Sequence, residues 1–151
     1  MVDTSILIDW IRARRAQNRT VQHQIFRSIL EETQGEQPLM SSYTAYELAR
    51  GDSADTDLPL LDSLIQTVPL RPSILKVATT YYRSLQGIKK APRFGEIDLL
   101  IAADATDLGA TLLTADLLQA SMGGIPPTSL HRTVYFAGTK LPAPPKAPAR
   151  R

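Results

Sequence analysis

The chain alternates short apolar segments with longer amphipathic ones along its whole length. The short segments have the size and composition of β-strands, and we expect strands at residues 2–4, 38–40, 67–70, 111–114 and 133–136. Between them, apolar residues recur at helical spacing, as Ile6, Leu7 and Trp10 do. Strands that are separated by helices are joined by crossovers and run parallel. The alternation therefore predicts an α/β fold of three layers, α/β/α, in which helices cover both faces of a central, mostly parallel sheet.

The length of 151 residues fits one domain with its own core. We expect this domain to span residues 1–138. Residues 139–151 hold four prolines and four basic residues and have few apolar groups to bury, so they are predicted to be a disordered tail. Only two residues precede Asp3, which indicates that the first strand is truncated or that the protein starts further upstream.

Composition excludes several classes of protein. The absence of cysteine excludes a disulfide scaffold, a thiolate zinc site and a cysteine nucleophile. No apolar run is long enough to cross a bilayer, and the first residues lack the basic start of a signal peptide. We therefore expect a cytoplasmic protein without a membrane partner. The net charge of +2 is too small to indicate nucleic-acid binding by itself.

Acidic residues follow the predicted strands at the positions where a parallel sheet binds its ligands. Ligands bind beyond the carboxyl ends of such strands. Asp3 ends the first strand, and Asp116 comes just after the fourth. Glu47 lies on the helix after the second strand, and Asp98 lies in the first turn of an apolar helix. Carboxylates that converge repel one another and need a compensating cation, for which Mg²⁺ is well suited because it binds carboxylate oxygens.

Helix capping is the alternative explanation for some of these acids. Asp98 and Asp116 both stand in the first turn of a predicted helix, where the dipole and the free amide groups favour an acid. Asp3 and Glu47 stand among apolar residues, where a carboxylate has few structural duties. Asp104 lies six positions after Asp98, roughly 1.7 helical turns on, and therefore on a different face. We leave Asp104 outside the cation ligands, as a hydrogen-bond acceptor behind them, a cap or a water-bound residue.

Four stretches of the chain resemble the PIN domain, and most closely the VapC-type toxins. They read Val-Asp-Thr-Ser-Ile-Leu-Ile-Asp at 2–9, Ser-Ser-Tyr-Thr-Ala-Tyr-Glu-Leu-Ala-Arg-Gly at 41–51, Asp-Leu-Leu-Ile-Ala-Ala at 98–103 and Gly-Ala-Thr-Leu-Leu-Thr-Ala-Asp at 109–116. The resemblance covers residues 2–136, nearly the whole chain. Four motifs in this order are a specific signal, whereas any one of them alone is weak.

The resemblance implies an endoribonuclease that depends on Mg²⁺ or Mn²⁺. It further implies a homodimer and a cognate antitoxin that blocks the acidic site. By motif position, the acidic quartet of the family corresponds to Asp3, Glu47, Asp98 and Asp116. Ser5 and Thr114 match the small hydroxyl residues that line that site. Residues 117–119 read Leu-Leu-Gln and lack the acid–aromatic pair often found there, which indicates a difference in specificity or rate.

We therefore expect the toxin of a type II toxin–antitoxin pair, which cleaves RNA phosphodiesters with a metal-activated water. The main alternative is a non-catalytic PIN domain that binds RNA or a protein partner. A second alternative is a Mg²⁺-dependent phosphatase with an aspartyl nucleophile. That chemistry needs a second acid just after Asp3, where Ser5 stands.

Basic and aromatic residues are the candidates for RNA contacts. Lys89, Lys90 and Arg93 lie in a segment that leads directly to Asp98 and would bring the phosphate backbone to the cation. Arg12 belongs to an arginine run that is either an RNA contact or an ordinary solvated helix end. Four tyrosines stand on predicted helices, where core packing is more common than base stacking; they are Tyr43, Tyr46, Tyr81 and Tyr82. The two histidines, His23 and His131, are isolated, and we assign them no role.

Overall fold

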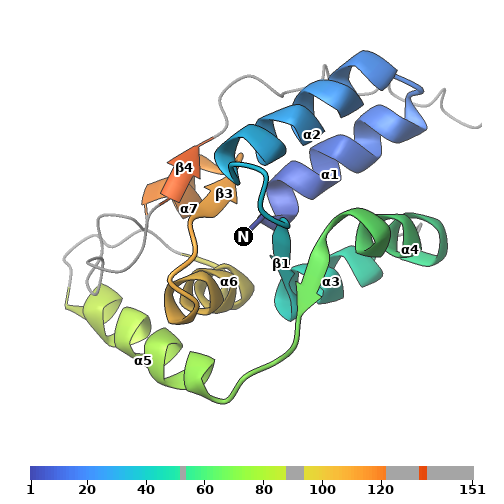
Figure 1. Cartoon of the computed structure of the whole chain (residues 1–151). Helices are drawn as coiled ribbons and strands as arrows, with labels where there is room; N and C mark the ends of the chain where they lie inside the picture. Colours follow the sequence, from blue (N-terminus) through green and yellow to red (C-terminus); the bar gives the residue numbers. More distant parts are fainter. Residues whose placement is uncertain (52–53, 88–93, 122–132, 136–151) are drawn as a thin grey trace, which may run out of the picture.

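The computed structural model describes residues 1–51, 54–87, 94–121 and 133–135 (Figure 1). Short strands and longer helices alternate in these residues, as the sequence predicts. In chain order the elements are α1 (Thr4–Arg15), α2 (Arg19–Glu32), β1 (Leu39–Ser41), α3 (Ser42–Ala49), α4 (Ala54–Leu64), β2 (Gln66–Val68), α5 (Ser73–Gln86), α6 (Glu96–Asp107), β3 (Leu112–Thr114), α7 (Leu117–Ser121) and β4 (Thr133–Tyr135).

The strands form two parallel pairs that the N-terminal residues connect. Strand β1 pairs with β2, and β3 pairs with β4. Val2 lies between the two pairs: it forms a parallel bridge with Leu113, and its backbone N–H donates to the carbonyl of Leu39 at 2.7 Å. On the other side, the Asp3 N–H donates to the carbonyl of Leu113 at 2.9 Å. The predicted parallel sheet is confirmed, with Asp3 at the end of its central segment.

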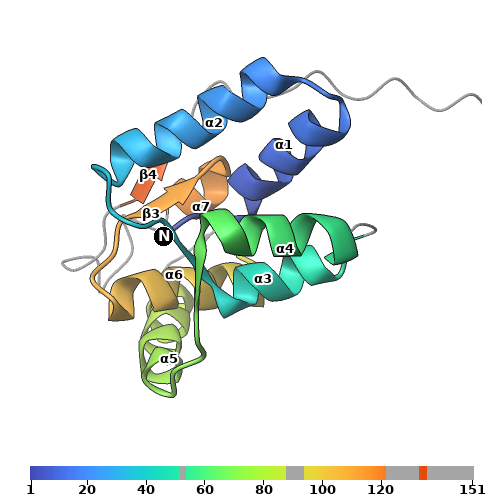
Figure 2. The ribbon, with the colours of Figure 1, turned by 45° about the vertical axis from the view of Figure 1, so that its right-hand side comes forward.

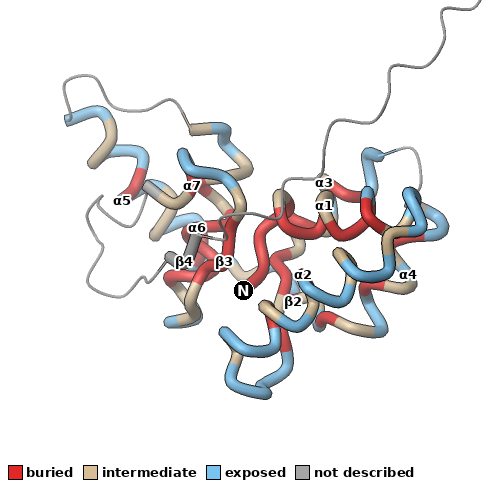
Figure 3. The backbone as a smooth tube through the Cα atoms, turned by 90° about the horizontal axis from the view of Figure 1, so that it is seen from above, coloured by how far each residue is buried: buried red, intermediate tan, exposed pale blue. Residues whose placement is uncertain are grey.

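Helices cover both faces of this sheet. Successive residues of a strand point to opposite faces. Met1 and Leu112 accordingly belong to the core that α5 and α6 complete, whereas Val2 and Leu113 belong to the core formed with α1 and α2. Figure 1 and Figure 2 show α1 and α2 on one side of the strands and α5 and α6 on the other. In Figure 3 the buried residues concentrate in the central strands and the helix faces around them.

Helix α6 is the most buried helix of the fold. Its residues Ile101, Ala102, Ala103 and Ala105 have no exposed surface, as its apolar composition predicts. It ends at Asp107, and Gly109 follows with φ +64°, a left-handed conformation that glycine adopts without penalty. The chain then turns directly into β3. Helix α6 packs between α5 and the sheet. Its first turn, at Glu96, lies at the end of this packed region and carries Asp98.

One local prediction differs from the structure, at the start of the chain. Helix α1 is capped by Asp3, whose carboxylate accepts a hydrogen bond from the Ser5 N–H. The helix begins at Thr4, inside the predicted first strand, because the Asp3 carboxylate accepts an N–H group of the first helical turn that has no partner within the helix. Phe136 and the predicted tail at 139–151 lie outside the described residues.

In the part of the chain that the structure describes, no helix has the length and apolar character that a membrane span requires.

Candidate functional site

Asp3 is the most enclosed of the predicted acids. It is only 3% exposed, and its carboxylate Oδ2 accepts hydrogen bonds from Ser5 Oγ at 2.6 Å and Thr114 Oγ1 at 2.8 Å. The two hydroxyl oxygens lie 3.2 Å from each other. A carboxylate held by two hydroxyl groups and capping its own helix has a fixed orientation. The predicted grouping of Asp3 with Ser5 and Thr114 is thus present in the structure.

The same hydroxyl groups hold the turn that carries Asp116. The Ala115 N–H donates to Ser5 Oγ at 2.9 Å, and the Asp116 N–H donates to Thr114 Oγ1 at 3.0 Å. Asp116 is exposed, and its Oδ1 accepts from the N–H groups of Leu118 at 2.6 Å and Gln119 at 3.3 Å. Asp116 therefore caps α7, while its backbone is attached to the site of Asp3.

Glu47 approaches Asp3 from α3. Ser41 caps this helix by accepting from the Tyr43 N–H at 3.2 Å, so α3 starts where β1 ends. Buried Thr44 and Leu48 fix which face of the helix points inward, and Glu47 lies half-buried beside that face. Its Oε2 accepts a hydrogen bond from Thr4 Oγ1 at 2.6 Å. Glu47 is thus connected to the first residue of α1, next to Asp3.

The pKa of Asp98 is affected by the other three acids. It is half-buried in the first turn of α6, and its Oδ2 accepts from the Gly95 N–H at 3.0 Å. Burial raises the pKa of Asp98 above its ordinary value, and the hydrogen bond from Gly95 opposes that shift. The negative charges of Asp3, Glu47 and Asp116 raise it further. All four acids therefore lie at one edge of the sheet, where Asp3, Glu47 and Asp116 are close enough for their charges to act on Asp98.

The four carboxylates nevertheless do not form a ready-made ligand cluster. Within residues 1–51, 54–87, 94–121 and 133–135, no three acidic or histidine side chains stand close enough to hold one ion. Each acid instead accepts hydrogen bonds from local donors, as expected for like charges that repel. Capping, which was the alternative for Asp98 and Asp116, is therefore observed for both. The donor set itself, four carboxylates and nearby hydroxyl groups, has the chemistry of a site for a hard divalent cation.

Gln119 is a residue of this site that the sequence did not reveal. It is 2% exposed, and its side-chain Nε2 donates to the backbone carbonyl of Asp98 at 3.1 Å. It therefore connects α7 to the first turn of α6. No local pattern indicates this role, because Gln119 is buried while its apolar neighbour Leu117 is 66% exposed.

Asp104 lies outside the acidic group. It is 1% exposed and pairs with Arg71, whose Nη2 lies 2.6 Å from Asp104 Oδ1 and 3.1 Å from Asp107 Oδ2. Burial raises the pKa of Asp104, a hydrogen bond from Ser41 and the charge of Arg71 oppose this, and Asp107 adds to it. The capping and water-bound roles considered for Asp104 are wrong, because its carboxylate is buried in an ion pair that attaches α6 to the segment after β2.

Among the predicted basic residues, Arg12 alone lies in the described part of the chain, and the structure does not bring it to the acids. Arg12 lies nine residues after Asp3, roughly 13 Å along α1, and pairs with Asp9 at 3.3 Å. The other arginines of the run, Arg14 and Arg15, bind buried Asp57 on α4, with Arg15 Nη2 at 3.2 Å from its Oδ2. Lys89, Lys90, Arg93 and His131 lie outside the described residues.

The tyrosines divide into two groups. Tyr81 is fully buried, with its hydroxyl 2.8 Å from Thr106 Oγ1, and Tyr43 packs partly buried against the same core. The expectation of core packing is confirmed for these two. It is wrong for Tyr46 and Tyr82, which are each 56% exposed because they lie on the outer faces of α3 and α5.

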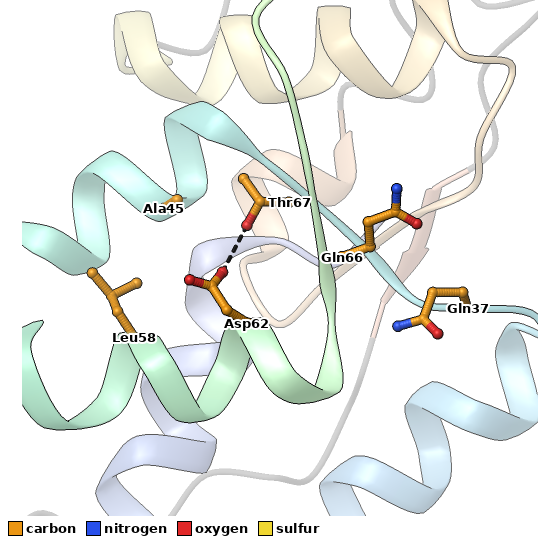
Figure 4. A pocket seen from close by; sticks show the side chains of 6 residues that line it. All are labelled: Gln37, Ala45, Leu58, Asp62, Gln66 and Thr67. Carbon is orange, nitrogen blue, oxygen red and sulfur yellow. Dashed lines mark hydrogen bonds between the residues drawn. The ribbon is translucent and has the colours of Figure 1, made fainter.

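A pocket elsewhere on the surface contains none of the predicted site residues. It lies where α3, α4 and β2 meet, and its lining is Gln37, Ala45, Leu58, Asp62, Gln66 and Thr67 (Figure 4). Asp62 is its only acid, and Thr67 Oγ1 donates to that carboxylate at 2.9 Å. A single carboxylate is a poor site for a divalent cation, so the edge of the sheet with Asp3, Glu47, Asp98 and Asp116, called the acidic edge below, remains the candidate.

Two solved structures have the same fold. One chain of the crystal structure of VapBC2 from Rickettsia felis, bound to a DNA fragment from their promoter, matches with a TM-score of 0.66 and 18% identity. The structure of VapBC-1 from nontypeable Haemophilus influenzae matches with a TM-score of 0.65 and 18% identity. In both comparisons the match covers 89% of this chain and 96% of the other. The predicted likeness to VapC-type structures is therefore found in the fold.

Comparison with curated proteins gives no match. The family model of the PIN domain matches residues 1–124, which include all four acids and every described element from α1 to α7. The chain therefore belongs to the PIN domain family.

Proposed function

We propose that this protein is a Mg²⁺-dependent endoribonuclease whose cation is held by Asp3, Glu47, Asp98 and Asp116, with Mn²⁺ as a possible substitute. The observation that carries the proposal is the gathering of the four acids around the end of the central segment of the sheet, where Ser5, Thr114 and Thr4 connect Asp3, Asp116 and Glu47. At Asp98, burial and then the charges of the other three acids raise the pKa. Acids that repel one another at a sheet edge are costly without a compensating charge. Membership of the PIN family supports the assignment to nucleases.

Each side chain has a role that follows from its contacts. Among the described residues, the hydrogen bonds to the Asp3 carboxylate all fall on Oδ2, which leaves Oδ1 as a ligand oxygen. Ser5 and Thr114 hold Asp3 in place and hold the turn before Asp116. Gln119 holds the first turn of α6 by donating to the backbone carbonyl of Asp98. Glu47, Asp98 and Asp116 would exchange their local donors for the cation. Bound Mg²⁺ would supply an activated water for attack on the RNA phosphodiester.

We further propose that the protein is the toxin of a type II toxin–antitoxin pair, acts in the cytoplasm and forms a homodimer. The fold likeness to two VapBC structures supports a cognate antitoxin as partner. An antitoxin that places a basic side chain against the four acids would neutralise their repulsion and compete with the cation.

Cleavage of labelled single-stranded RNA by the purified chain tests the proposal. Cleavage with Mg²⁺ or Mn²⁺ that EDTA abolishes is the expected result. A folded protein that cleaves with neither metal contradicts it and favours the alternative, a non-catalytic PIN domain that binds RNA or a protein partner.

A further inference from the structure

An exposed aromatic ring and an exposed cation stand beside Glu47 on α3. Tyr46 is the residue before Glu47, and 56% of it is exposed. Arg50 follows one helical turn later, is itself exposed, and its guanidinium carbon lies 5.8 Å from the centroid of the Tyr46 ring. Residues four apart share a helix face, so ring and cation form one surface. We call Tyr46 and Arg50 the α3 platform.

No carboxylate in the described part of the chain neutralises the charge of Arg50. In that part of the chain, Arg12, Arg14, Arg15, Arg27 and Arg71 have carboxylate partners, whereas Arg50 has none, like Arg19 and Arg83. Of these three, Arg50 is the one that contacts an aromatic ring. The core side of α3 is formed by Thr44 and Leu48, so the Tyr46 ring contributes little to the core. Ring and cation are both available to a ligand, and contact between them limits the freedom that Arg50 loses on binding.

We propose that the α3 platform binds single-stranded RNA next to the acidic edge, with a base stacked on the Tyr46 ring and a phosphate bound by Arg50. This inference rests on the proposed function and names the form of its substrate. A phosphodiester held at the acids places its neighbouring nucleotides over the adjoining helices, and α3 carries Glu47. Stacking on an aromatic ring requires an unpaired base, since paired bases hide their faces in the duplex. The platform therefore favours single strands over duplex RNA.

Two matched pairs of variants test the platform. Tyr82 is as exposed as Tyr46 but lies on α5, in the outer layer of the fold, and Arg83 on the same helix is exposed like Arg50 (Figure 1). Binding of a fluorescent single-stranded RNA of on the order of ten nucleotides is measured by anisotropy in EDTA at low salt, where metal-dependent cleavage is blocked. Tyr46→Ala should weaken binding about tenfold, and Tyr46→Phe and Tyr82→Ala should bind like the wild type. Arg50→Gln should reduce the salt slope by about 0.7, with no change for Arg83→Gln.

Steady-state kinetics with Mg²⁺ separate this inference from the proposed function. Tyr46→Ala should raise KM about tenfold with kcat nearly unchanged, because the ring binds a nucleotide away from the reacting phosphate. If the wild type cleaves RNA and Tyr46→Ala binds and cleaves like Tyr82→Ala, the platform is wrong and the nuclease function stands. If binding depends on Tyr46 but no metal supports cleavage, the platform stands and the nuclease function falls. Equal competition by duplex RNA, or no RNA binding by the wild type, overturns the platform.

Discussion

Opposing effects act on the ionised form of Asp98. As a residue of the first helical turn it accepts the Gly95 N–H and benefits from the helix dipole. Burial and three nearby negative charges act against its ionised form, and the raised pKa shows that these are stronger. A carboxyl group with a raised pKa in the folded state binds its proton more tightly there than in the unfolded chain. Its contribution to stability is therefore most favourable below the ordinary value of 3.8 and is lost as the pH rises through the folded pKa.

The first prediction concerns the stability of Asp98→Asn without metal. The amide keeps an oxygen that can accept the Gly95 N–H and removes the repelled charge, so the melting temperature in EDTA at neutral pH should equal or exceed that of the wild type. The difference should disappear below pH 3.8, where the wild-type carboxyl group is itself protonated. Thermal unfolding at both pH values measures this. If Asp98→Asn instead loses about 0.5–2 kcal/mol of unfolding free energy at both pH values, Asp98 is an ordinary cap.

The second prediction compares two acids of the same helix. Asp98→Asn should abolish Mg²⁺-dependent RNA cleavage, because it removes a proposed ligand. Asp104→Asn should retain most of the activity, because Asp104 contacts Arg71 and not the acidic edge. Initial rates of cleavage decide the comparison, with circular dichroism to verify that both variants fold. If both variants fold and lose the same fraction of cleavage activity, Asp98 is not distinguished from Asp104 as a cation ligand.

At the scale of elements, the sequence predicts those features that depend on neighbouring residues. Apolar segments and their spacing predicted the four strands that the structure describes and the apolar helix α6. Contacts between distant residues have no such local signal. The partner of Arg14 and Arg15 is Asp57, more than 40 residues away on α4, so these two arginines of the run form ion pairs that the sequence did not indicate. Gln119 was missed for the same reason, because only the packing of α7 against α6 buries it.

The third prediction tests the connection between α1 and α4. The Asp57 side chain is 4% exposed, whereas those of Arg14 and Arg15 are 38% and 51% exposed. Either arginine can rehydrate, so Arg14→Gln or Arg15→Gln alone should cost less than about 1 kcal/mol of unfolding free energy. The double variant leaves a buried carboxylate with fewer partners and should cost about 1–3 kcal/mol, more than the sum of the single variants.

Urea unfolding of the two single variants and the double variant measures this coupling. Adding Asp57→Asn to the double variant should restore part of the loss, because it removes the poorly compensated charge. Strictly additive single effects, or a further loss on adding Asp57→Asn, would show that the arginines do not act through Asp57.

At the scale of the whole molecule, the acidic edge is where the layers of the fold meet. Asp3 ends the central segment of the sheet, Glu47 is carried by α3, Asp98 by α6, and Asp116 by the turn between β3 and α7. The family and the convergence of these segments followed from four motifs in the right order. The sequence did not predict how each carboxylate is oriented. The orientation depends on hydrogen-bond donors such as Thr4 and Gly95, which compete with a cation for the carboxylate oxygens.

Because four separate segments supply the acids, a cation bound by them should stabilise the fold as a whole. A ligand that binds only the native state stabilises it by mass action, on the order of 2.7 kcal/mol at a hundred times its dissociation constant. The fourth prediction is that Mg²⁺ raises the melting temperature of the wild type and that this gain is reduced in Asp98→Asn and Asp116→Asn. Asp62→Asn is the matched control, since Asp62 lies in the separate pocket beside Thr67. It should gain as much as the wild type.

Thermal unfolding of these four proteins, in EDTA and in Mg²⁺ at constant ionic strength, makes the comparison independent of general screening. A capping carboxylate stabilises the fold equally with and without metal. A carboxylate that binds the cation stabilises the fold further only when metal is added. If Mg²⁺ raises all four melting temperatures by the same amount, Asp98 and Asp116 are caps alone, and the metal-dependent nuclease loses its physical basis. A gain confined to the wild type and Asp62→Asn would instead mean that the repulsion felt by Asp98 is what the cation relieves.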